Sequence, residues 1–301
     1  MTTIESMAKN KKILLGFSLF LEHILPYEKM EEKARMKSAP MVHLGGGAYN
    51  IVKTLESLGV KPQALELFGI TGRGIHPQRI AVEDLLKRER FSARLLATHE
   101  RPSTSYYLVP EGGQTWAFGD PGGKNLPLTA ADRNAVQKGA AAADIRILTE
   151  IRDDAKEINL VKLAFKKNSP NQVNVLIPAI DLLKSKKMYE LIPHIDLLSL
   201  NEVEARVLFC KDPQEEDILT LSIPNVLITR GAGEAWLKAG NRIWKASPRK
   251  LKQAKFVGGA GDAATAALLY KLFIKKERPE TGLRFALDIG TKTLQVPTSY
   301  Y

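Results

Sequence analysis

The chain has 301 residues, of which 44% are hydrophobic and 26% are charged. This composition is typical of a folded globular protein with a substantial core, and it excludes a wholly disordered, collagen-like or membrane-spanning chain. Lys and Arg total 44 against 33 Asp and Glu, a net charge of +11 that favours anionic ligands without identifying them.

The first predicted element is the apolar run at 13–21, which follows the basic segment 9–12 (KNKK). Its length matches the core of a signal peptide, but Glu22 and His23 follow it instead of a small-residue cleavage site. It is also far shorter than the roughly 20 residues needed to span a bilayer. We therefore expect a buried first strand, no membrane association and, because the single Cys210 cannot form an internal disulfide, a cytoplasmic protein.

Further apolar runs alternate with segments of helical period. Strands are predicted at 64–68, 145–148, 173–177, 195–200 and 226–229. Helices are predicted at 48–58, 79–90, 182–191, 261–273 and 283–294. This alternation indicates an α/β fold of three α/β/α layers around a mostly parallel sheet. Since no repeat or interdomain linker is evident, we expect residues 1–301 to form a single domain.

Two segments, at about 17–43 and 97–120, break this alternation. They carry partly polar strand patterns, such as 104–109 (TSYYLV), with no helix between them. Small antiparallel strands beside a parallel core are suited to cover a ligand site, so we expect a small antiparallel β lid there. An exposed edge of such a lid would favour a homodimer.

The most informative segment is 256–270 (FVGGAGDAATAALLY). Its glycines predict a turn that presents backbone N–H groups at the start of a helix, where the dipole favours an anion. Asp262 falls in the first helical turn, which should hold it ionised. Amides that stabilise a transferred phosphoryl group beside a carboxylate that accepts a proton are suited to phosphoryl transfer. Alternatively, the glycines make an ordinary turn and Asp262 caps the helix.

The second informative segment is 43–59 (HLGGGAYNIVKTLESLG), where three glycines precede a helix and Asn50 lies in its first turn. Glycines allow a polyol to approach the backbone, and an amide side chain supplies donors and an acceptor for hydroxyl groups. A plain glycine-rich turn with Asn50 as helix cap is the alternative interpretation.

The third segment is 199–208 (SLNEVEARVL), directly after an apolar strand. Asn201 and Glu204 are three residues apart, so their oxygens would lie on one helical face, where they could hold a hydrated Mg²⁺. The same spacing also predicts a capping box, with Asn201 as the N-cap and Glu204 as its partner.

Taken in this order, the three segments resemble the signatures of the ribokinase-like (PfkB-type) carbohydrate kinases. The matching motifs are 45–50 (GGGAYN), 201–204 (NEVE) and 259–262 (GAGD). The resemblance covers almost the whole chain. It implies that Asp262 is the catalytic base and that the amides of Gly259, Ala260 and Gly261 form the anion hole for the γ-phosphate.

The resemblance also assigns the binding residues. Asn50, with the backbone of Gly45 and Gly46, would bind the sugar-like acceptor. Asn201 and Glu204 would organise Mg²⁺ and its waters. We therefore expect Asp262 to face Asn50 across a gap the size of a phosphate.

The nucleotide would contact the end of a strand at 227–231 (LITRG), through Thr229 and Gly231. The family pattern continues to a further glycine, whereas here Glu234 occupies that position and the glycine has moved to Gly233.

Two further departures concern the cation and the acceptor. The family usually carries an Asp-Thr pair where this chain has Phe256 and Val257, so the implied monovalent cation is doubtful. An acceptor-binding Asp is expected at Leu21, and Glu22 could replace it if the strand carried a one-residue bulge. A substrate contact at Glu150, where a strand end would face the cleft, competes with a solvated helix start.

The function that follows from the resemblance is an ATP- and Mg²⁺-dependent kinase that phosphorylates a hydroxymethyl group of a sugar or sugar-like molecule. The departures at Leu21, Glu234 and Phe256 leave an alternative: a kinase-fold protein with weakened catalysis that serves as a binding or scaffold subunit. Nucleic acid is an unlikely partner, because basic clusters such as 249–255 (RKLKQAK) lack interleaved aromatic residues and are interpreted as solvated faces.

Overall fold

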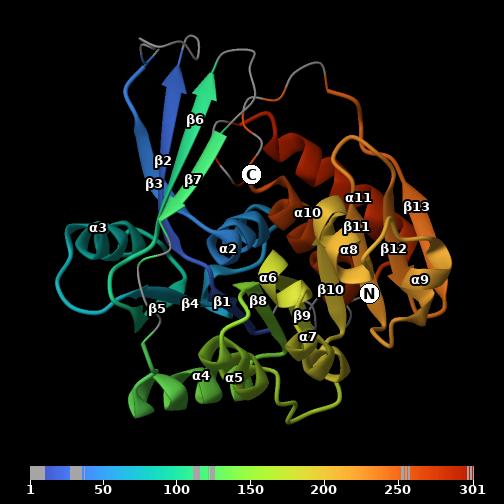
Figure 1. Ribbon diagram of the computed structural model, residues 1–301, viewed down its shortest axis with the longest axis horizontal. Coiled ribbons are helices and arrows are strands. Elements are labelled where there is room, and N and C mark those ends of the chain that lie inside the picture. The colour runs from blue at the N-terminus through green and yellow to red at the C-terminus, as the bar shows by residue number, and fades with distance from the viewer. Residues whose placement is uncertain are drawn as a thin grey trace, which may run out of the picture.

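A computed structural model describes residues 11–27, 36, 38–110, 116–120, 122, 126–251, 254, 256, 258–296, 298 and 300. In these residues the chain forms a nine-stranded sheet with helices on both faces and a separate four-stranded sheet (Figure 1). This confirms the predicted three-layer α/β/α architecture with a smaller β sheet beside it. No helix of the described part is long and apolar enough to cross a membrane.

The large sheet is parallel over most of its width. Its strands lie in the order β13 (Arg242–Ala246), β12 (Ala235–Ala239), β11 (Asn225–Thr229), β10 (Leu197–Asn201), β9 (Val173–Pro178), β8 (Ile145–Ile151), β1 (Ile13–Phe17), β4 (Leu65–Gly72) and β5 (Ser92–His99). Only β12 and β13 join it by antiparallel pairing. Parallel strands are covered on both faces, and accordingly all five residues of β1 are buried.

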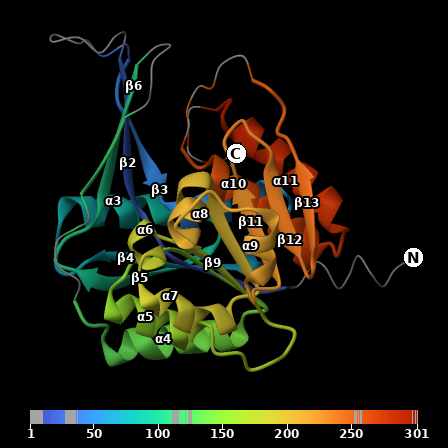
Figure 2. The same cartoon turned by 45° about the vertical axis from the view of Figure 1, so that its right-hand side comes forward.

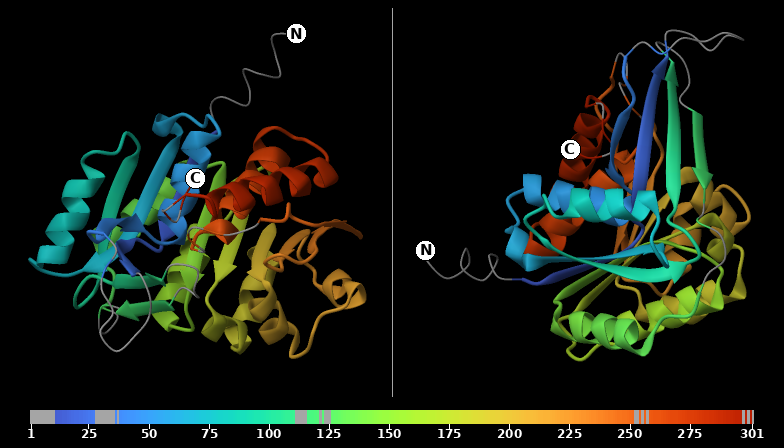
Figure 3. Two further views of the ribbon diagram at one scale, coloured as in Figure 1. Left: turned by 90° about the horizontal axis from the view of Figure 1, so that it is seen from above. Right: turned by 90° about the vertical axis from the view of Figure 1, so that its left-hand side faces the viewer.

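Helices cover the two faces of this sheet, as Figures 2 and 3 show. One face carries α2 (Gly47–Ser57), α3 (Pro77–Leu86), α10 (Ala260–Leu269) and α11 (Pro279–Thr293). The other carries α4 (Ala130–Ala142), α5 (Ala155–Ala164), α6 (Ile180–Leu183), α7 (Lys186–Leu191), α8 (Glu202–Phe209) and α9 (Glu215–Thr220). Short 3₁₀ helices lie at Pro62–Ala64 and Ile192–His194, and a π-helical turn, Tyr270–Ile274, continues α10. Alternate side chains of the strands fill one hydrophobic core or the other.

The smaller sheet comes from the two segments expected to form the lid. Its order is β3 (Met41–Gly45), β2 (Phe20–Tyr27), β6 (Thr104–Pro110) and β7 (Trp116–Asp120), and it stands at one end of the large sheet (Figure 1). The outer pairs are antiparallel, whereas β2 and β6 are parallel, so the sheet is mixed. The pairing of β2 with β3 runs without a shift from Phe20 to Ile24. The one-residue bulge that would have brought Glu22 into the position of Leu21 is therefore absent from this pairing.

The central strand β1 offers a direct test of the core. Leu14 is 0% exposed and belongs to the hydrophobic core to which α4 and α5 contribute side chains. We expect Leu14→Ala to lower the free energy of unfolding by about 2–5 kcal/mol, because it removes buried methyl groups and leaves a cavity. Urea denaturation measures this change. The control Ile75→Ala removes a side chain that is 90% exposed, and a loss as large as that of Leu14→Ala would contradict the packing described.

Candidate functional site

The predicted site residues gather where parallel strands end and helices begin. Strands β1, β8, β10 and β11 end at this edge of the large sheet, and helices α2, α8 and α10 start there. Loops at the carboxyl ends of parallel strands form the usual ligand crevice of an open α/β sheet. The site therefore lies where the topology favours it.

The contact at its centre joins two helices that are distant in sequence. Asp262 lies in the first turn of α10 and Asn50 lies in α2. The Nδ2 group of Asn50 donates a hydrogen bond to Oδ2 of Asp262 over 2.9 Å. The two residues are brought together as expected, but they touch directly and no phosphate-sized gap separates them.

The glycine triplet allows this contact because it lets other segments approach α2 closely. Gly46 has a φ of +97°, which disfavours any other residue, and a Cβ there would lie 2.7 Å from the Ser18 carbonyl oxygen. A Cβ on Gly47 would lie 3.2 Å from Oδ1 of Asp262. The start of α2 thus lies between the β1–β2 loop and the carboxylate of α10.

Gly45 has a different neighbour, the side chain of Glu22. This side chain is 1% exposed, and a Cβ on Gly45 would lie 2.0 Å from its carboxyl carbon. Oε2 of Glu22 lies 3.7 Å from Nε2 of His43, and burial lowers the pKa of that imidazole. Glu22 therefore reaches the acceptor side of the site from an ordinary strand position, without a bulge.

Asp262 is surrounded by negative charge. Desolvation, opposed by the hydrogen bond from Asn50 and reinforced by the charges of Glu150 and Glu204, raises the pKa of its carboxyl group to about 7. Our expectation that the helix N-terminus keeps this group ionised is wrong, because desolvation and two nearby carboxylates outweigh the helix dipole. A carboxyl group with a pKa near neutrality is suited to exchange protons.

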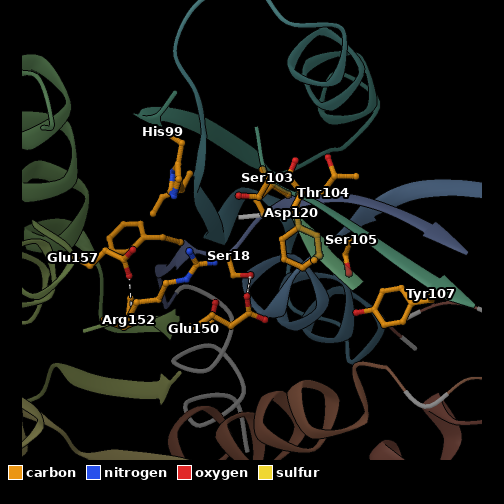
Figure 4. Close-up of a pocket in the computed structure, with 17 residues that line it drawn as sticks. Ser18, His99, Ser103, Thr104, Ser105, Tyr107, Asp120, Glu150, Arg152 and Glu157 are labelled. Atoms are coloured by element: carbon orange, nitrogen blue, oxygen red, sulfur yellow. Dashed lines mark hydrogen bonds between the residues drawn. The ribbon is translucent and has the colours of Figure 1, made fainter. Parts of the chain in front are cut away.

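Glu150 lies at the end of β8 with a φ of 55°. Its Oε2 accepts a hydrogen bond of 2.5 Å from the Ser18 hydroxyl (Figure 4), and desolvation raises the pKa of its carboxyl group. A cavity of about 330 Å³ opens beside this pair, between the end of β8 and strand β6 of the smaller sheet. Its polar lining includes Ser18, Thr149, Glu150, Arg152, Ser105 and Tyr107.

A second cavity, of about 450 Å³, lies on the other side of the α10 N-terminus. Thr229 and Gly231, the predicted nucleotide contacts, line it together with Ala260 and Gly261 of the predicted anion hole. Apolar walls come from Leu251, Ala264, Leu287 and Leu294. A planar base would fit between such walls, and the phosphates would point toward the α10 N-terminus.

The remaining nucleotide candidate does not join them. Gly233 is absent from the lining of this cavity, and its N–H donates to the Arg230 carbonyl within a tight turn. Glu234 points away and accepts a hydrogen bond from the indole of Trp236. Two residues of the basic cluster at 249–255 do line the cavity, namely Arg249 and Lys250. Both side chains are also exposed, as a solvated face requires, and Lys252, Gln253 and Lys255 lie outside the described residues.

Asn201 and Glu204 form the capping box that the sequence left as an alternative. Oδ1 of Asn201 accepts from the Glu204 N–H at 2.9 Å, and Oε2 of Glu204 accepts from the Asn201 N–H at 2.7 Å. Desolvation and the charge of Glu150 raise the pKa of the Glu204 carboxyl group. Among the described residues, no group of three His, Cys, Asp or Glu side chains has the arrangement of a metal site.

The pair that replaces the family's Asp-Thr is only partly described. Phe256 is 1% exposed and lies beneath the turn that precedes α10. Val257 lies outside the described residues. Sequence reasoning missed Tyr107, whose hydroxyl lies within electrostatic reach of three site carboxylates, those of Glu22, Glu150 and Asp262. The strand pattern of 104–109 (TSYYLV) predicted its strand but not its orientation.

Comparison with known proteins identifies the family and agrees with the fold. The family model described as "pfkB family carbohydrate kinase" matches residues 19–300. No curated protein sequence matches the chain.

Solved structures show the same fold at low sequence identity. Phosphofructokinase-2 from Escherichia coli in complex with potassium is 16% identical, with 96% of this chain and 94% of that chain covered and a TM-score of 0.73. Adenosine kinase from Sinorhizobium meliloti is 14% identical, with coverage of 97% and 96% and a TM-score of 0.75. The microbiome-derived acarbose kinase Mak1 is 12% identical, with coverage of 95% and 93% and a TM-score of 0.77.

The electrostatics of Asp262 predict a pH-dependent cost to stability. Its pKa rises from an ordinary 3.8 to about 7 on folding, so the folded state keeps a proton that the unfolded state releases. Stability therefore falls as pH rises from about 4 to about 7. Asp262→Asn should remove this dependence and be the more stable protein above pH 7, by up to about 4 kcal/mol.

Urea denaturation at several pH values measures this difference. The control Asp288→Asn, on the exposed side of α11, should show no such pH-dependent gain. A stability difference between Asp262→Asn and the parent protein that does not change with pH would contradict the prediction.

Proposed function

The chain belongs to the pfkB family of carbohydrate kinases, and on that premise we propose that it transfers the γ-phosphate of ATP to a sugar. The acceptor group is a hydroxyl, in our proposal a hydroxymethyl group of a sugar or sugar-like molecule. The observation that carries the proposal is the Asn50–Asp262 contact at the N-terminus of α10. It places a carboxylate beside backbone N–H groups that favour an anion.

In this proposal Asp262 is the base that accepts the proton of the attacking hydroxyl. Its pKa of about 7 supports the role, because a general base works best when its pKa lies near the operating pH. The N–H groups of Gly259, Ala260 and Gly261 stabilise the charge of the transferred phosphoryl group. Asn50 would turn its amide from Asp262 to the acceptor hydroxyls when substrate displaces their mutual hydrogen bond.

Two cavities support the placement of the two substrates. The nucleotide occupies the cavity lined by Thr229 and Gly231, where Arg249 and Lys250 attract its phosphates. The acceptor occupies the cavity beside Glu150, with the backbone of Gly45 and Gly46 and the buried carboxylate of Glu22 nearby. Asp262 lies between them, in the same turn as Gly261 and in contact with Gly47.

We propose that a Mg²⁺ ion arrives with the nucleotide and is held through its waters, since no group of described side chains forms a direct metal site. Glu150 raises the pKa of Glu204, and both raise that of Asp262. This mutual repulsion of carboxylates is relieved by a divalent cation, and Mg²⁺ prefers oxygen ligands while retaining several waters. Because Asn201 and Glu204 already bond to the backbone of α8, they would hold the ion through its waters. The ion supplies positive charge that offsets charge on the phosphates.

The test is acceptor-stimulated release of ADP from MgATP with a panel of sugars and nucleosides. Activity should rise with pH through an apparent pKa near 7, the value of the Asp262 carboxyl group. Asp262→Ala should lower kcat/KM by about 10²–10⁴-fold, the usual contribution of a general base. The matched control Asp288→Ala, also on a C-terminal helix, should retain activity.

The alternative proposal, a weakened kinase that acts as a binding or scaffold subunit, makes a different forecast. It predicts nucleotide binding by calorimetry without any acceptor-stimulated turnover. Full activity of Asp262→Ala would contradict both the assigned base and the mechanism built on it.

We also propose that the chain forms a homodimer through the outer face of the smaller sheet. Val42, His23, Tyr106 and Phe118 pair directly across its four strands and form one row. Val42, Tyr106 and Phe118 are 48%, 40% and 54% exposed. Burial lowers the pKa of the His23 imidazole, so the row is uncharged on a protein of net charge +11. A second copy related by a two-fold axis could cover it without placing like charges together.

Phe118→Glu should dissociate this dimer, because the two-fold axis would place two new carboxylates at one interface. Light scattering after size-exclusion chromatography measures the mass. The control Tyr189→Glu changes a side chain that is 61% exposed on α7 and should leave the mass unchanged. A monomeric parent protein at all concentrations would exclude the dimer.

A further inference from the structure

Phe256 occupies a position where a cation site would require oxygen. The resemblance to the family implies a monovalent cation near the turn before α10, with ligands from an Asp-Thr pair. Alkali cations are bound by carbonyl, carboxylate and hydroxyl oxygens. Phe256 provides none from its side chain, which is 1% exposed and apolar. The side chain of Phe256 therefore cannot serve as a ligand of such a cation.

The ring of Phe256 instead packs against the turn at 258–261, whose N–H groups form the proposed anion hole. A Cβ added to Gly258 would lie 2.5 Å from Cε1 and 2.8 Å from Cζ of this ring. The ring thus packs directly on the α-carbon of Gly258, and no larger residue fits there. Gly259 follows with a φ of 75° and begins α10. The path of the backbone through the turn is consequently fixed by an apolar contact.

A second aromatic residue links this turn to the smaller sheet. The rings of Tyr107, on β6, and Phe256 meet edge to face, with centroids 5.0 Å apart and an interplanar angle of 77°. The Tyr107 hydroxyl lies near the acceptor side of the site, where desolvation and then the charges of Glu22, Glu150 and Asp262 raise its pKa to about 12. Tyr107 therefore contacts Phe256, which supports the turn, and it also lines the proposed acceptor cavity.

We propose that the Tyr107–Phe256 contact replaces a monovalent cation: it holds the 258–261 turn in place and makes nucleotide binding independent of K⁺ and Na⁺. Phe256 and Tyr107 are positioning residues in this role, since they act on the phosphates through the turn. The consequence for turnover rests on the proposed function, whereas the binding tests below do not require turnover.

The first test measures thermal unfolding in KCl, NaCl, CsCl or tetramethylammonium chloride at equal ionic strength. The midpoint should be the same in all four salts, within about 1 °C. A cation bound at 100 times its dissociation constant would add about 2.7 kcal/mol and raise the midpoint by several degrees. A selective rise in K⁺ or Na⁺ would overturn the proposal, whether or not the protein is an active kinase.

The second test measures the MgATP dissociation constant by calorimetry in KCl and in tetramethylammonium chloride. The two values should agree, and a constant tenfold lower in KCl would overturn the proposal. If MgATP binds in neither salt, the proposed function fails, and the unfolding experiment still decides the question of the cation.

Substitutions distinguish an effect on MgATP affinity from an effect on the unfolding midpoint alone. Phe256→Leu and Tyr107→Leu each remove the edge-to-face contact, and each should weaken MgATP binding by about 2- to 10-fold. The double variant should be no weaker than the weaker single variant, since both lose the same contact. The matched control Phe165→Leu alters a ring that is also 1% exposed but lies on the opposite face of the sheet. It should lower the unfolding midpoint without changing the MgATP dissociation constant.

Additive losses of affinity in the double variant would show that the two rings act independently and would overturn the role of their contact. An equal loss of affinity in Phe165→Leu would show that the rings act only through overall stability. Recovery of MgATP affinity in Phe256→Leu on addition of KCl would likewise contradict the absence of a cation site.

Discussion

The site depends on one hydrogen bond, from the amide of Asn50 to the carboxylate of Asp262. It joins the start of α2 to the start of α10, two helices that pack together on the same face of the large sheet. Gly47 favours this close approach, since a Cβ there would meet Oδ1 of Asp262 at a tight 3.2 Å. A local requirement for glycine thus fixes a contact between residues that are far apart in the chain.

This geometry separates charge within the site. Carboxylates of Glu22, Glu150 and Asp262 lie near Tyr107, on the proposed acceptor side, whereas Arg249 and Lys250 border the cavity proposed for the nucleotide. A polyanionic nucleotide is attracted to the second region and repelled from the first. Desolvation and, to a smaller extent, the neighbouring carboxylates raise the pKa of Asp262, so the charge arrangement of the site also favours its proposed role as a base.

The fold could be predicted well where the sequence pattern has a single physical cause. Strand β1 is buried on both faces and therefore reads as an unbroken apolar run, ILLGF. Strand β5, SARLLATH, was missed because its first three residues are exposed and its composition is mixed. The predicted helix at 182–191 is two helices, since the Ser185 side chain accepts from the Lys187 N–H and starts α7. The apolar residues keep a continuous helical period across this point, so the period alone did not reveal the cap that divides the segment.

A site residue could be predicted only where it lies at a backbone feature that the sequence itself reveals, such as a glycine turn before a helix. Asp262 and Asn50 could be placed because each follows a glycine turn at the start of a helix. Tyr107 could not be distinguished from Tyr106 by sequence, because neighbours on a strand face opposite sides and nothing local shows which side is inner. The register decides it: Tyr106 pairs with His23 on the outer face, and Tyr107 reaches Phe256 on the inner face. Any partner that covers the outer face therefore also restrains the strand that carries Tyr107 into the site.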